Sequence, residues 1–319
     1  MVSAYLLANF GGPRHPNDIE VFLTSLLTDR DVTGGFLPSF IHKRLFSFIA
    51  RKRTPKVLPQ YNCIGGFSPI YQDTESLAQT LSLQLDTPVI TFHRYLPDTH
   101  QHTIQKLKAL GNCPIVGVPL FPHFTYAVTG SIVRFIRNQL PSLNISWVPH
   151  FGTHPQFISC MIDHILKFLQ SHDIPTNDCC LLFSAHGLPM RYVNKGDPYN
   201  MQCEKSFKAI SERLENIETH LCYQSKFGPG KWLTPSTKDK CARLNTDKKY
   251  VLIVPFGFTS DHIETLYEIE KEYISILIER KYRALRIPAI YQSPQWVESL
   301  ATIIQSTPYV ENKSLIKSQ

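Results

Sequence analysis

The sequence predicts an α/β protein with two similar doubly wound, Rossmann-like domains, each a four-stranded parallel sheet flanked by helices, with a ligand cleft between them. Short runs rich in Val, Ile and Leu alternate with stretches whose apolar residues recur at helical spacing. Such continuous apolar runs are typical of strands buried on both faces, and helices supply the long connections that parallel strands need. The eight expected strands form two sets of four. This indicates domains at 1–150 and 151–319, with the option that the last helix packs back on the first domain.

The expected elements alternate along the whole chain. The strands are expected at 4–10, 88–95, 113–121, 144–151, 179–186, 219–225, 250–258 and 284–290. The helical patterns between them cover 17–28, 40–52, 72–86, 99–110, 129–140, 155–171, 201–216 and 261–282.

Composition narrows the class of protein. The 319 residues are 43% hydrophobic and 18% charged, which is typical of a globular chain. No apolar run reaches the ~18–20 residues of a spanning helix, and the N-terminus lacks a basic leader, so we expect a cytoplasmic protein. The net charge of +7 suits an anionic small molecule, an acidic membrane surface or nucleic acid and selects none of them. The eight cysteines contain no Cys-x-x-Cys pair, which favours reduced core thiols over disulfides or a metal cluster.

Polar, glycine-rich and aromatic residues gather where the expected strands end. These segments are 9–13, 119–124, 184–187, 224–229 and 255–262. Ligands of doubly wound sheets bind beyond the carboxyl ends of the strands. We therefore expect both strand sets to open onto one shared cleft.

His186 is the first candidate for chemistry. It ends an apolar strand, and Gly187-Leu188-Pro189 then turns the chain. A near-neutral pKa suits histidine to proton transfer or metal binding. The alternative is a structural histidine held by a backbone carbonyl at the strand end.

An acidic stripe is the second candidate. Glu264, Glu268 and Glu272 are spaced i, i+4, i+8, which places them on one helical face. Like charges at that spacing repel, so the stripe favours a cation, a proton or water nearby. In the alternative, Asp261 caps the helix with Glu264 as its capping-box partner, and Lys271 neutralises Glu268 on a solvated face.

Two further segments could contact a flat apolar ligand. The loop 224–233 is rich in glycine and aromatic residues, although Trp232 could equally cap a core. The stretch 34–53 predicts an interfacial helix or a flap, or else an ordinary amphipathic helix packed on its own domain. Its apolar face holds Phe40, Ile41, Leu45, Phe48 and Ile49.

Taken together, five segments in this order resemble the ferrochelatase family, and the resemblance runs over most of the chain. They are NFGGP at 9–13, IGGFSPI at 64–70, FSAHGLP at 183–189, QSKFGP at 224–229 and FTSDHIETLYE at 258–268. The resemblance implies a lyase that inserts ferrous iron into protoporphyrin IX in the terminal step of haem biosynthesis. The loop 225–229 looks closer to relatives that use protoporphyrin.

The resemblance also implies roles for individual residues. His186 is the expected catalytic histidine and Glu264 its acidic partner, and the two would bind the metal or accept the pyrrole protons. Glu268 and Glu272 would form an acidic conduit for metal or protons. The expected porphyrin-binding residues are Phe10, Leu37, Ser68, Pro69, Ile70, Arg94 and Trp232.

The expected partners are the porphyrin and ferrous iron, both as substrates, and not nucleic acid. The region Phe36–Phe48 resembles the hydrophobic lip of the cleft, which rests on a membrane in some relatives. Peripheral membrane contact, at the inner face, is therefore expected through segment 36–49. The oligomeric state stays open.

Two departures from the family pattern carry expectations. Some relatives hold an iron–sulfur cluster, but the internal cysteine position appears here as Tyr126 and no cysteine follows Cys241. We therefore expect no cluster and no permanently bound cofactor. Phe10 stands where some relatives have tyrosine or methionine, which leaves only apolar contact at that position. The alternatives are use of coproporphyrin III, loading of cobalt or nickel into another tetrapyrrole, and a non-enzymatic haem or porphyrin carrier.

Overall fold

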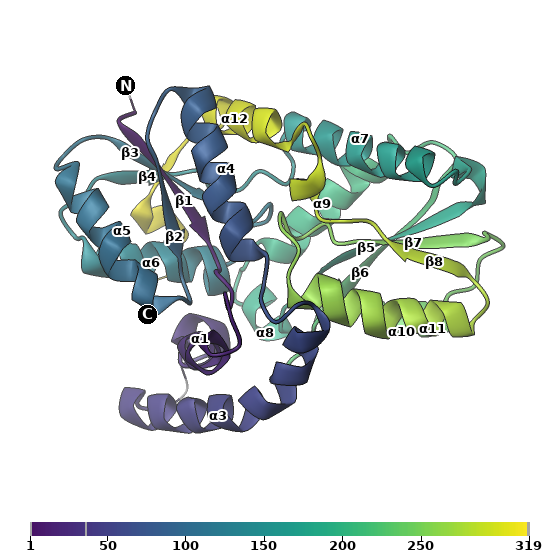
Figure 1. Cartoon of the computed structure of the whole chain (residues 1–319), viewed down its shortest axis with the longest axis horizontal. Helices are drawn as coiled ribbons and strands as arrows, with labels where there is room; N and C mark the ends of the chain where they lie inside the picture. The colour runs from purple at the N-terminus through teal and green to yellow at the C-terminus, as the bar shows by residue number, and fades with distance from the viewer. Residues whose placement is uncertain (1, 36, 318–319) are drawn as a thin grey trace. The chain divides into compact units, whose positions relative to one another are not determined.

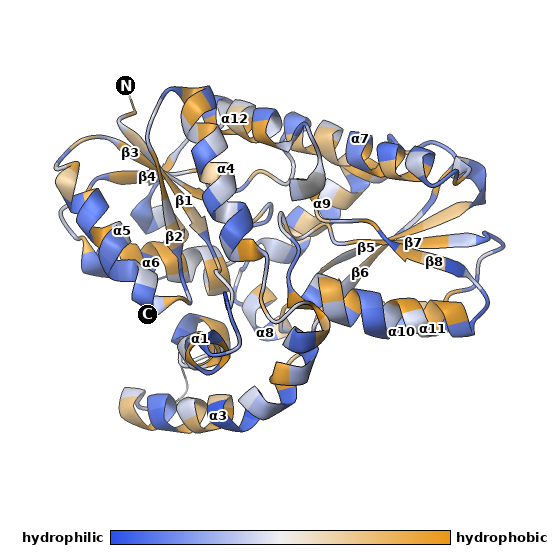
Figure 2. Ribbon diagram, viewed as in Figure 1, coloured by the Kyte–Doolittle hydropathy of each residue, from blue (hydrophilic) through white to orange (hydrophobic). Residues whose placement is uncertain are grey.

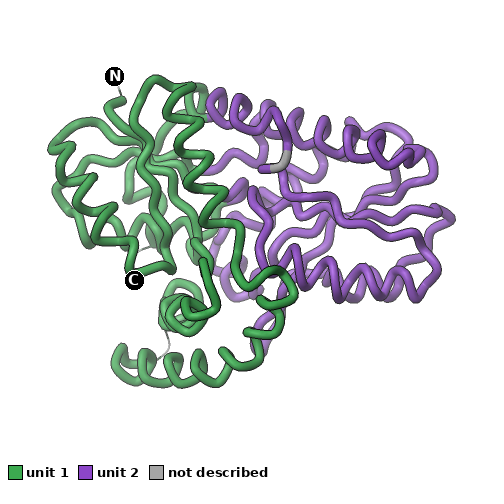
Figure 3. Tube along the Cα trace, in the orientation of Figure 1, with its two compact units in different colours: residues 1–120, 124–149, 304–319 green, residues 121–123, 150–303 purple. Residues whose placement is uncertain are grey.

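The computed structural model describes residues 2–35 and 37–317 (Figure 1). The chain divides into two compact units (Figure 3): unit 1 holds residues 1–120, 124–149 and 304–319, and unit 2 holds residues 121–123 and 150–303. The sequence-based division gave 151–319 to one domain, with the option that the last helix packs back on the first domain. In the structure the terminal segment from 304 belongs to unit 1, because a short C-terminal strand pairs with that unit's sheet.

The sheet of unit 1 has the strand order β2-β1-β3-β4-β9. Its strands are β1 (Ala4–Asn9), β2 (Val89–His93), β3 (Ile115–Pro119), β4 (Ile145–Trp147) and β9 (Val310–Glu311). The first four are parallel, and β9 runs antiparallel beside β4. The predicted four-stranded parallel sheet is therefore extended by a fifth strand, which is too short to show an apolar pattern.

The sheet of unit 2 has four parallel strands in the order β6-β5-β7-β8, as predicted. They are β5 (Cys179–His186), β6 (Glu218–Gln224), β7 (Tyr250–Val254) and β8 (Arg283–Arg286). All residues of β5 except His186 are buried. A central strand covered on both faces needs such a continuous apolar run, and most strand residues are hydrophobic in Figure 2.

Unit 1 contains six α-helices among its described residues. They are α1 (Asp18–Leu27), α2 (Arg30–Thr33), α3 (Ser39–Cys63), α4 (Ile70–Leu85), α5 (Pro97–Ala109) and α6 (Ser131–Gln139). The helix α3 runs 11 residues beyond the predicted end at 52 and keeps Pro55 and Pro59 inside it. Proline usually ends a helix, which is why the sequence pattern stopped short. Before α6, Tyr126–Gly130 form one turn of π-helix, and Asn312–Leu315 form a 3₁₀ turn.

The helices of unit 2 flank its sheet. They are α7 (Pro155–Ser171), α8 (Met190–Val193), α9 (Tyr199–Ser211), α10 (Thr237–Arg243), a π-helix (Glu264–Tyr273) and α11 (Ile274–Glu279). Two 3₁₀ turns lie at Thr176–Asp178 and Ile290–Gln292, and α12 (Trp296–Ser306) spans the division between the units. The sequence reading missed α10 and α12, and it predicted one continuous α-helix over 261–282. No helix among the described residues is both long and apolar enough to cross a bilayer.

Candidate active site at the end of strand β5

His186 and Glu264 form a hydrogen-bonded pair within unit 2. His186 is the last residue of β5, and Glu264 begins the π-helix that follows β7. The Nδ1 atom of His186 lies 2.8 Å from Oε2 of Glu264, and the two side chains are 41% and 28% exposed. The imidazole is therefore paired with a carboxylate, and the alternative of a histidine fixed by a backbone carbonyl does not describe it.

The alternative, in which Asp261 and Glu264 form a capping box, is not observed. The backbone N–H of Glu264 donates to Nδ1 of His262 at 3.1 Å. Asp261 instead accepts hydrogen bonds from the hydroxyl of Thr265 (2.7 Å) and from Arg286 (2.8 Å). Since the carboxylate of Glu264 is not used as a cap, it reaches His186.

Glu268 continues this cluster, whereas Glu272 does not. The Glu268 carboxylate accepts hydrogen bonds from the backbone N–H of Ser225 at 3.0 Å, from the Ser225 hydroxyl and from the phenol of Tyr273. Lys271 and Glu272 are exposed. The helix is wound with i→i+5 hydrogen bonds, which alters which residues share a face. Of the three carboxylates in the predicted stripe, Glu264 and Glu268 therefore lie in the cluster, and Glu272 is exposed to solvent.

The pKa values of this cluster are strongly perturbed. Burial lowers the pKa of His186, but the charge and hydrogen bond of Glu264, together with the charge of Glu268, outweigh it and raise that pKa. Burial raises the pKa of Glu264, yet the charge and hydrogen bond of His186 hold it at about 2. Burial and the charge of Glu264 raise the pKa of Glu268. At neutral pH the site therefore favours an imidazolium–carboxylate pair beside a carboxyl group that protonates readily.

Hydrogen bonds from buried side chains hold the backbone of His186 and Glu264 in place. The hydroxyl of Ser184 donates to Oε1 of Gln224 at 2.6 Å, and Nε2 of Gln224 donates to the backbone carbonyl of Glu264 at 3.3 Å. The phenol of Tyr199 donates to the carbonyl of His186 at 3.0 Å. Sequence reasoning missed the supporting roles of Gln224 and Tyr199. Gln224 lay inside a quoted motif, whereas nothing in the local pattern around Tyr199 signalled a contact with β5.

Trp232 packs against the turn that follows His186. It forms an antiparallel bridge with Pro189, and the Nε1 of its half-buried indole has no hydrogen-bond partner among the described residues. A Cβ at Gly187 would lie 2.7 Å from the carbonyl oxygen of Gln224 and 3.3 Å from the indole ring. Glycine is therefore required where this turn passes between its neighbours.

The other predicted porphyrin-binding residues lie in unit 1. They are Phe10, Leu37, Ser68, Pro69, Ile70 and Arg94. Ser68 and Ile70 are buried against Gly12, where an added Cβ would come within 2.7 Å of both side chains. Phe10 is half-buried with its ring edge-on to Tyr95. The structure thus gathers the segments 9–13 and 64–70 around the end of β1.

Arg94 is already paired within unit 1. Its guanidinium donates to the carboxylate of Asp29 at 2.8 Å and to the hydroxyl of Ser131 at 2.9 Å. It also lies over the rings of Tyr95 and Phe135, 5.0 and 4.7 Å from their centroids. Its charge is balanced by Asp29, a partner that sequence reasoning did not identify because it lies 65 residues away along the chain.

The predicted lip is an exposed apolar face on α3. Phe36 lies outside the described residues, Leu37 is half-buried, and Phe40 is 75% exposed. The other exposed apolar residues of this helix are Ile41, Leu45 and Phe48, with Ile49 half-buried. Large exposed apolar side chains grouped in this way are typical of an interaction surface.

Solved structures of chelatases share the fold of this chain. SirB from Bacillus subtilis with Fe³⁺ superposes with a TM-score of 0.57 at 14% identity, covering 96% of this chain and 95% of SirB. CbiX, the terminal enzyme for biosynthesis of siroheme in denitrifying bacteria, superposes with a TM-score of 0.51 at 13% identity, covering 95% of this chain and 98% of CbiX. At such identities the likeness is one of fold alone.

The chain belongs to the ferrochelatase family, whose family model matches residues 2–307. The ferrochelatase of Chlamydia caviae is 87% identical over the full length of both chains. That of Chlamydia pneumoniae is 58% identical over 99% of this chain and 96% of its own, and that of Chlamydia trachomatis serovar L2 is 57% identical over 95% and 96%. The family expected from the five motifs is therefore confirmed.

Proposed function

We propose that the protein is a lyase that inserts ferrous iron into protoporphyrin IX in the last step of haem biosynthesis. Membership of the ferrochelatase family supports iron insertion into a porphyrin. The observation that carries the proposal is the 2.8 Å pair between Nδ1 of His186 and Oε2 of Glu264, with Glu268 next to it. A haem carrier would need no such ionised pair.

The chemistry requires a base and a weak metal-binding site. Each turnover releases two pyrrole protons as Fe²⁺ sheds water and binds the four nitrogens. His186, once deprotonated, accepts a proton from the porphyrin, and Glu264 holds the resulting imidazolium. Imidazole and carboxylate bind borderline Fe²⁺ without the tight grip of thiolate ligands, so the metal can pass on. Glu268, whose pKa is raised, accepts protons from the pair and passes them on toward solvent.

The porphyrin contacts follow from residue chemistry. We infer that Phe10, Leu37, Pro69, Ile70 and Trp232 supply apolar contacts to the macrocycle, with Ser68 as a hydrogen-bonding group. Since Arg94 is paired with Asp29, its role in the proposal is to hold the end of β2 in place rather than to bind a propionate.

We also propose that the enzyme works without a permanently bound cofactor. Iron is a substrate in the reaction. Tyr126 occupies the position of the internal cluster cysteine of some relatives, and the last cysteine of the chain is Cys241. Among the six buried cysteines, Cys179, Cys180 and Cys222 lie on the strands β5 and β6 and not in a C-terminal trio.

We propose that the protein is cytoplasmic and that its segment 36–49 makes peripheral contact with a membrane surface. The apolar residues Phe40, Ile41, Leu45 and Phe48 are exposed on α3. Exposed basic residues lie on the same helix: Lys43, Arg44, Arg51 and Lys52. An apolar face flanked by lysine and arginine favours the interface of an anionic bilayer.

A metallation assay tests the main proposal. Loss of porphyrin fluorescence is followed with Fe²⁺ or Zn²⁺, using protoporphyrin IX and coproporphyrin III side by side. Wild type should metallate protoporphyrin IX faster, and His186→Ala should lose nearly all turnover. Near-wild-type turnover by His186→Ala would overturn the assigned role, and faster use of coproporphyrin III would overturn the substrate. Tight haem binding without any turnover would identify a carrier instead.

A further inference from the structure

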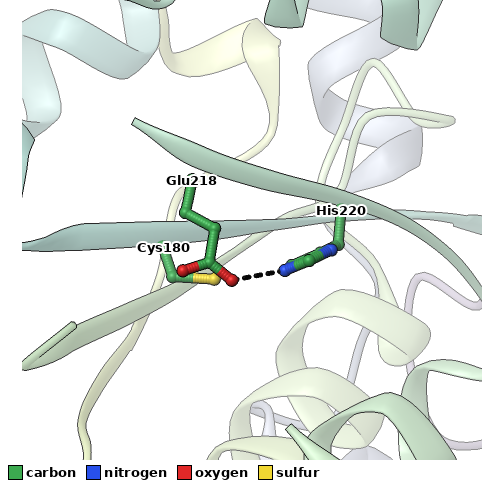
Figure 4. Close-up of side chains that lie close together, drawn as sticks. All are labelled: Cys180, Glu218 and His220. Atoms are coloured by element: carbon green, nitrogen blue, oxygen red, sulfur yellow. Dashed lines mark hydrogen bonds and ion pairs between the residues drawn. The ribbon is translucent and has the colours of Figure 1, made fainter. Parts of the chain in front are cut away.

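A second cluster of metal-binding side chains lies at the start of β5 and β6, in unit 2 (Figure 4). It consists of Cys180, Glu218 and His220, whose ligand atoms all lie within 4.8 Å of one another. His186 is six residues further along β5, which at about 3.3 Å per residue is roughly 20 Å away. The cluster is therefore separate from the candidate active site.

The sheet brings these three side chains together by register. Cys180 on β5 is paired with Glu218 on the neighbouring parallel strand β6. Directly paired residues point to the same face, and His220, two residues after Glu218, shares that face. The arrangement is therefore built on two strands of a sheet and not on a loop.

The hydrogen bonds within the cluster orient the ligand atoms. Nε2 of His220 lies 2.6 Å from Oε1 of Glu218, and the hydroxyl of Thr246 donates to the other carboxylate oxygen. The side chains of Glu218 and His220 are 28% and 31% exposed, while Cys180 is fully buried beneath them. An ion can therefore enter from solvent past the carboxylate and imidazole, and the Thr246 contact holds the carboxylate in place as an outer-shell partner does.

We propose that Cys180, Glu218 and His220 bind a borderline divalent transition-metal cation such as Zn²⁺, with water completing a four-coordinate site. One thiolate, one imidazole and one carboxylate are donors that zinc accepts together. Neither Ca²⁺ nor Mg²⁺, which prefer oxygen ligands, fits this set. The bound cation ties the edge strand β6 to β5.

Cobalt(II) absorption tests the site, because a thiolate bound to Co²⁺ gives a charge-transfer band that ligation by His186 and Glu264 cannot give. The background is the full chain carrying His186→Ala, Cys63→Ser and Cys113→Ser, which removes the candidate active-site ligand and the two exposed thiols. Addition of Co²⁺ should produce the band, and Zn²⁺ should abolish it. Absence of the band in this background would overturn the proposal.

Matched variants then locate the ligand. Cys180→Ser should abolish the band, whereas Cys179→Ser, an equally buried neighbour on the opposite face of β5, should leave it unchanged. His220→Gln should weaken Co²⁺ binding by about tenfold or more. If Cys180→Ser does not fold, as judged by circular dichroism, His220→Gln decides the matter because its side chain is partly exposed. A band that survives Cys180→Ser, or an unchanged affinity in His220→Gln, would contradict the assignment.

Discussion

The imidazole of His186 at the end of β5 is joined through Nδ1 to Oε2 of Glu264, 78 residues later in the chain, over 2.8 Å. The pair links the end of β5 to the start of the π-helix that follows β7. Its electrostatics give the first prediction.

The rate of metallation should rise with pH through an ionisation above 6.5. Glu264 and Glu268 raise the pKa of His186 above its ordinary value of 6.5, so the base form is scarce until the pH passes that raised pKa. In Glu264→Gln the ionisation should move to lower pH, because the largest favourable charge is gone. Rate profiles between pH 5.5 and 9 would show it, and the His186 ring resonance in NMR gives the same pKa if turnover is too weak. An unshifted ionisation would contradict the pairing.

The same pair should stabilise the fold within a definite pH window. The lowered pKa of Glu264 adds stability above 4.5, its ordinary value, and that stability is lost as pH falls through about 2. The raised pKa of His186 adds stability below 6.5, and that stability is lost as pH rises through the folded-state pKa. The stability difference between wild type and His186→Ala should therefore be largest between pH 4.5 and 6.5. Urea unfolding at several pH values measures it, and a difference that grows above pH 8 would count against the pair.

Glu268 and Glu272 should behave differently despite their similar predicted roles. Glu268→Gln should lower kcat about tenfold or more, because the proton-accepting carboxylate beside Glu264 is removed. Glu272→Gln, an exposed position on the same helix, should keep near-wild-type kcat. Steady-state metallation of protoporphyrin IX compares the two. Equal losses in both variants would restore the three-residue conduit.

The Arg94–Asp29 pair should matter for stability. Asp29 is nearly buried and Arg94 is largely so, and Asp29 also accepts hydrogen bonds from Tyr95 and Ser131. Asp29→Asn leaves a buried guanidinium poorly compensated and should cost about 3 kcal/mol of unfolding free energy. Glu212→Gln, which breaks the exposed pair with Lys208, should cost less than about 1 kcal/mol. Denaturant titrations distinguish the two, and equal costs would show that burial does not set the strength of the Arg94 pair.

The exposed face of α3 should govern membrane contact. Replacing Phe40 and Phe48 together by serine should reduce co-sedimentation with anionic phosphatidylserine vesicles several-fold, because apolar insertion is lost. Leu83→Ser, another highly exposed apolar residue but on α4, serves as the control and should leave vesicle binding unchanged. Vesicle binding that is equally weak in wild type would refute peripheral contact.

Much of the fold could be predicted from the sequence because its strands and helices depend on local patterns of hydrophobic residues. Alternating apolar runs and amphipathic stretches determined the parallel strands, and β5 and α7 were predicted to their observed limits. The five motifs determined the family. Strand β9 and helices α10 and α12 were not predicted. β9 and α10 are only two and seven residues long, which is too short for a clear hydrophobic periodicity, and strand pairing and helix packing stabilise them.

The sequence by itself therefore determined that His186 stands at the end of a strand and Glu264 near the start of a helix. Only the tertiary structure decided which side chains meet. In the structure Glu264 pairs with His186 and does not form a capping box. Glu268 accepts hydrogen bonds from Ser225 and Tyr273, whereas Glu272 is exposed to solvent. Arg94 pairs with Asp29. Contacts between residues far apart in the chain depend on strand register and helix winding, which local periodicity does not encode.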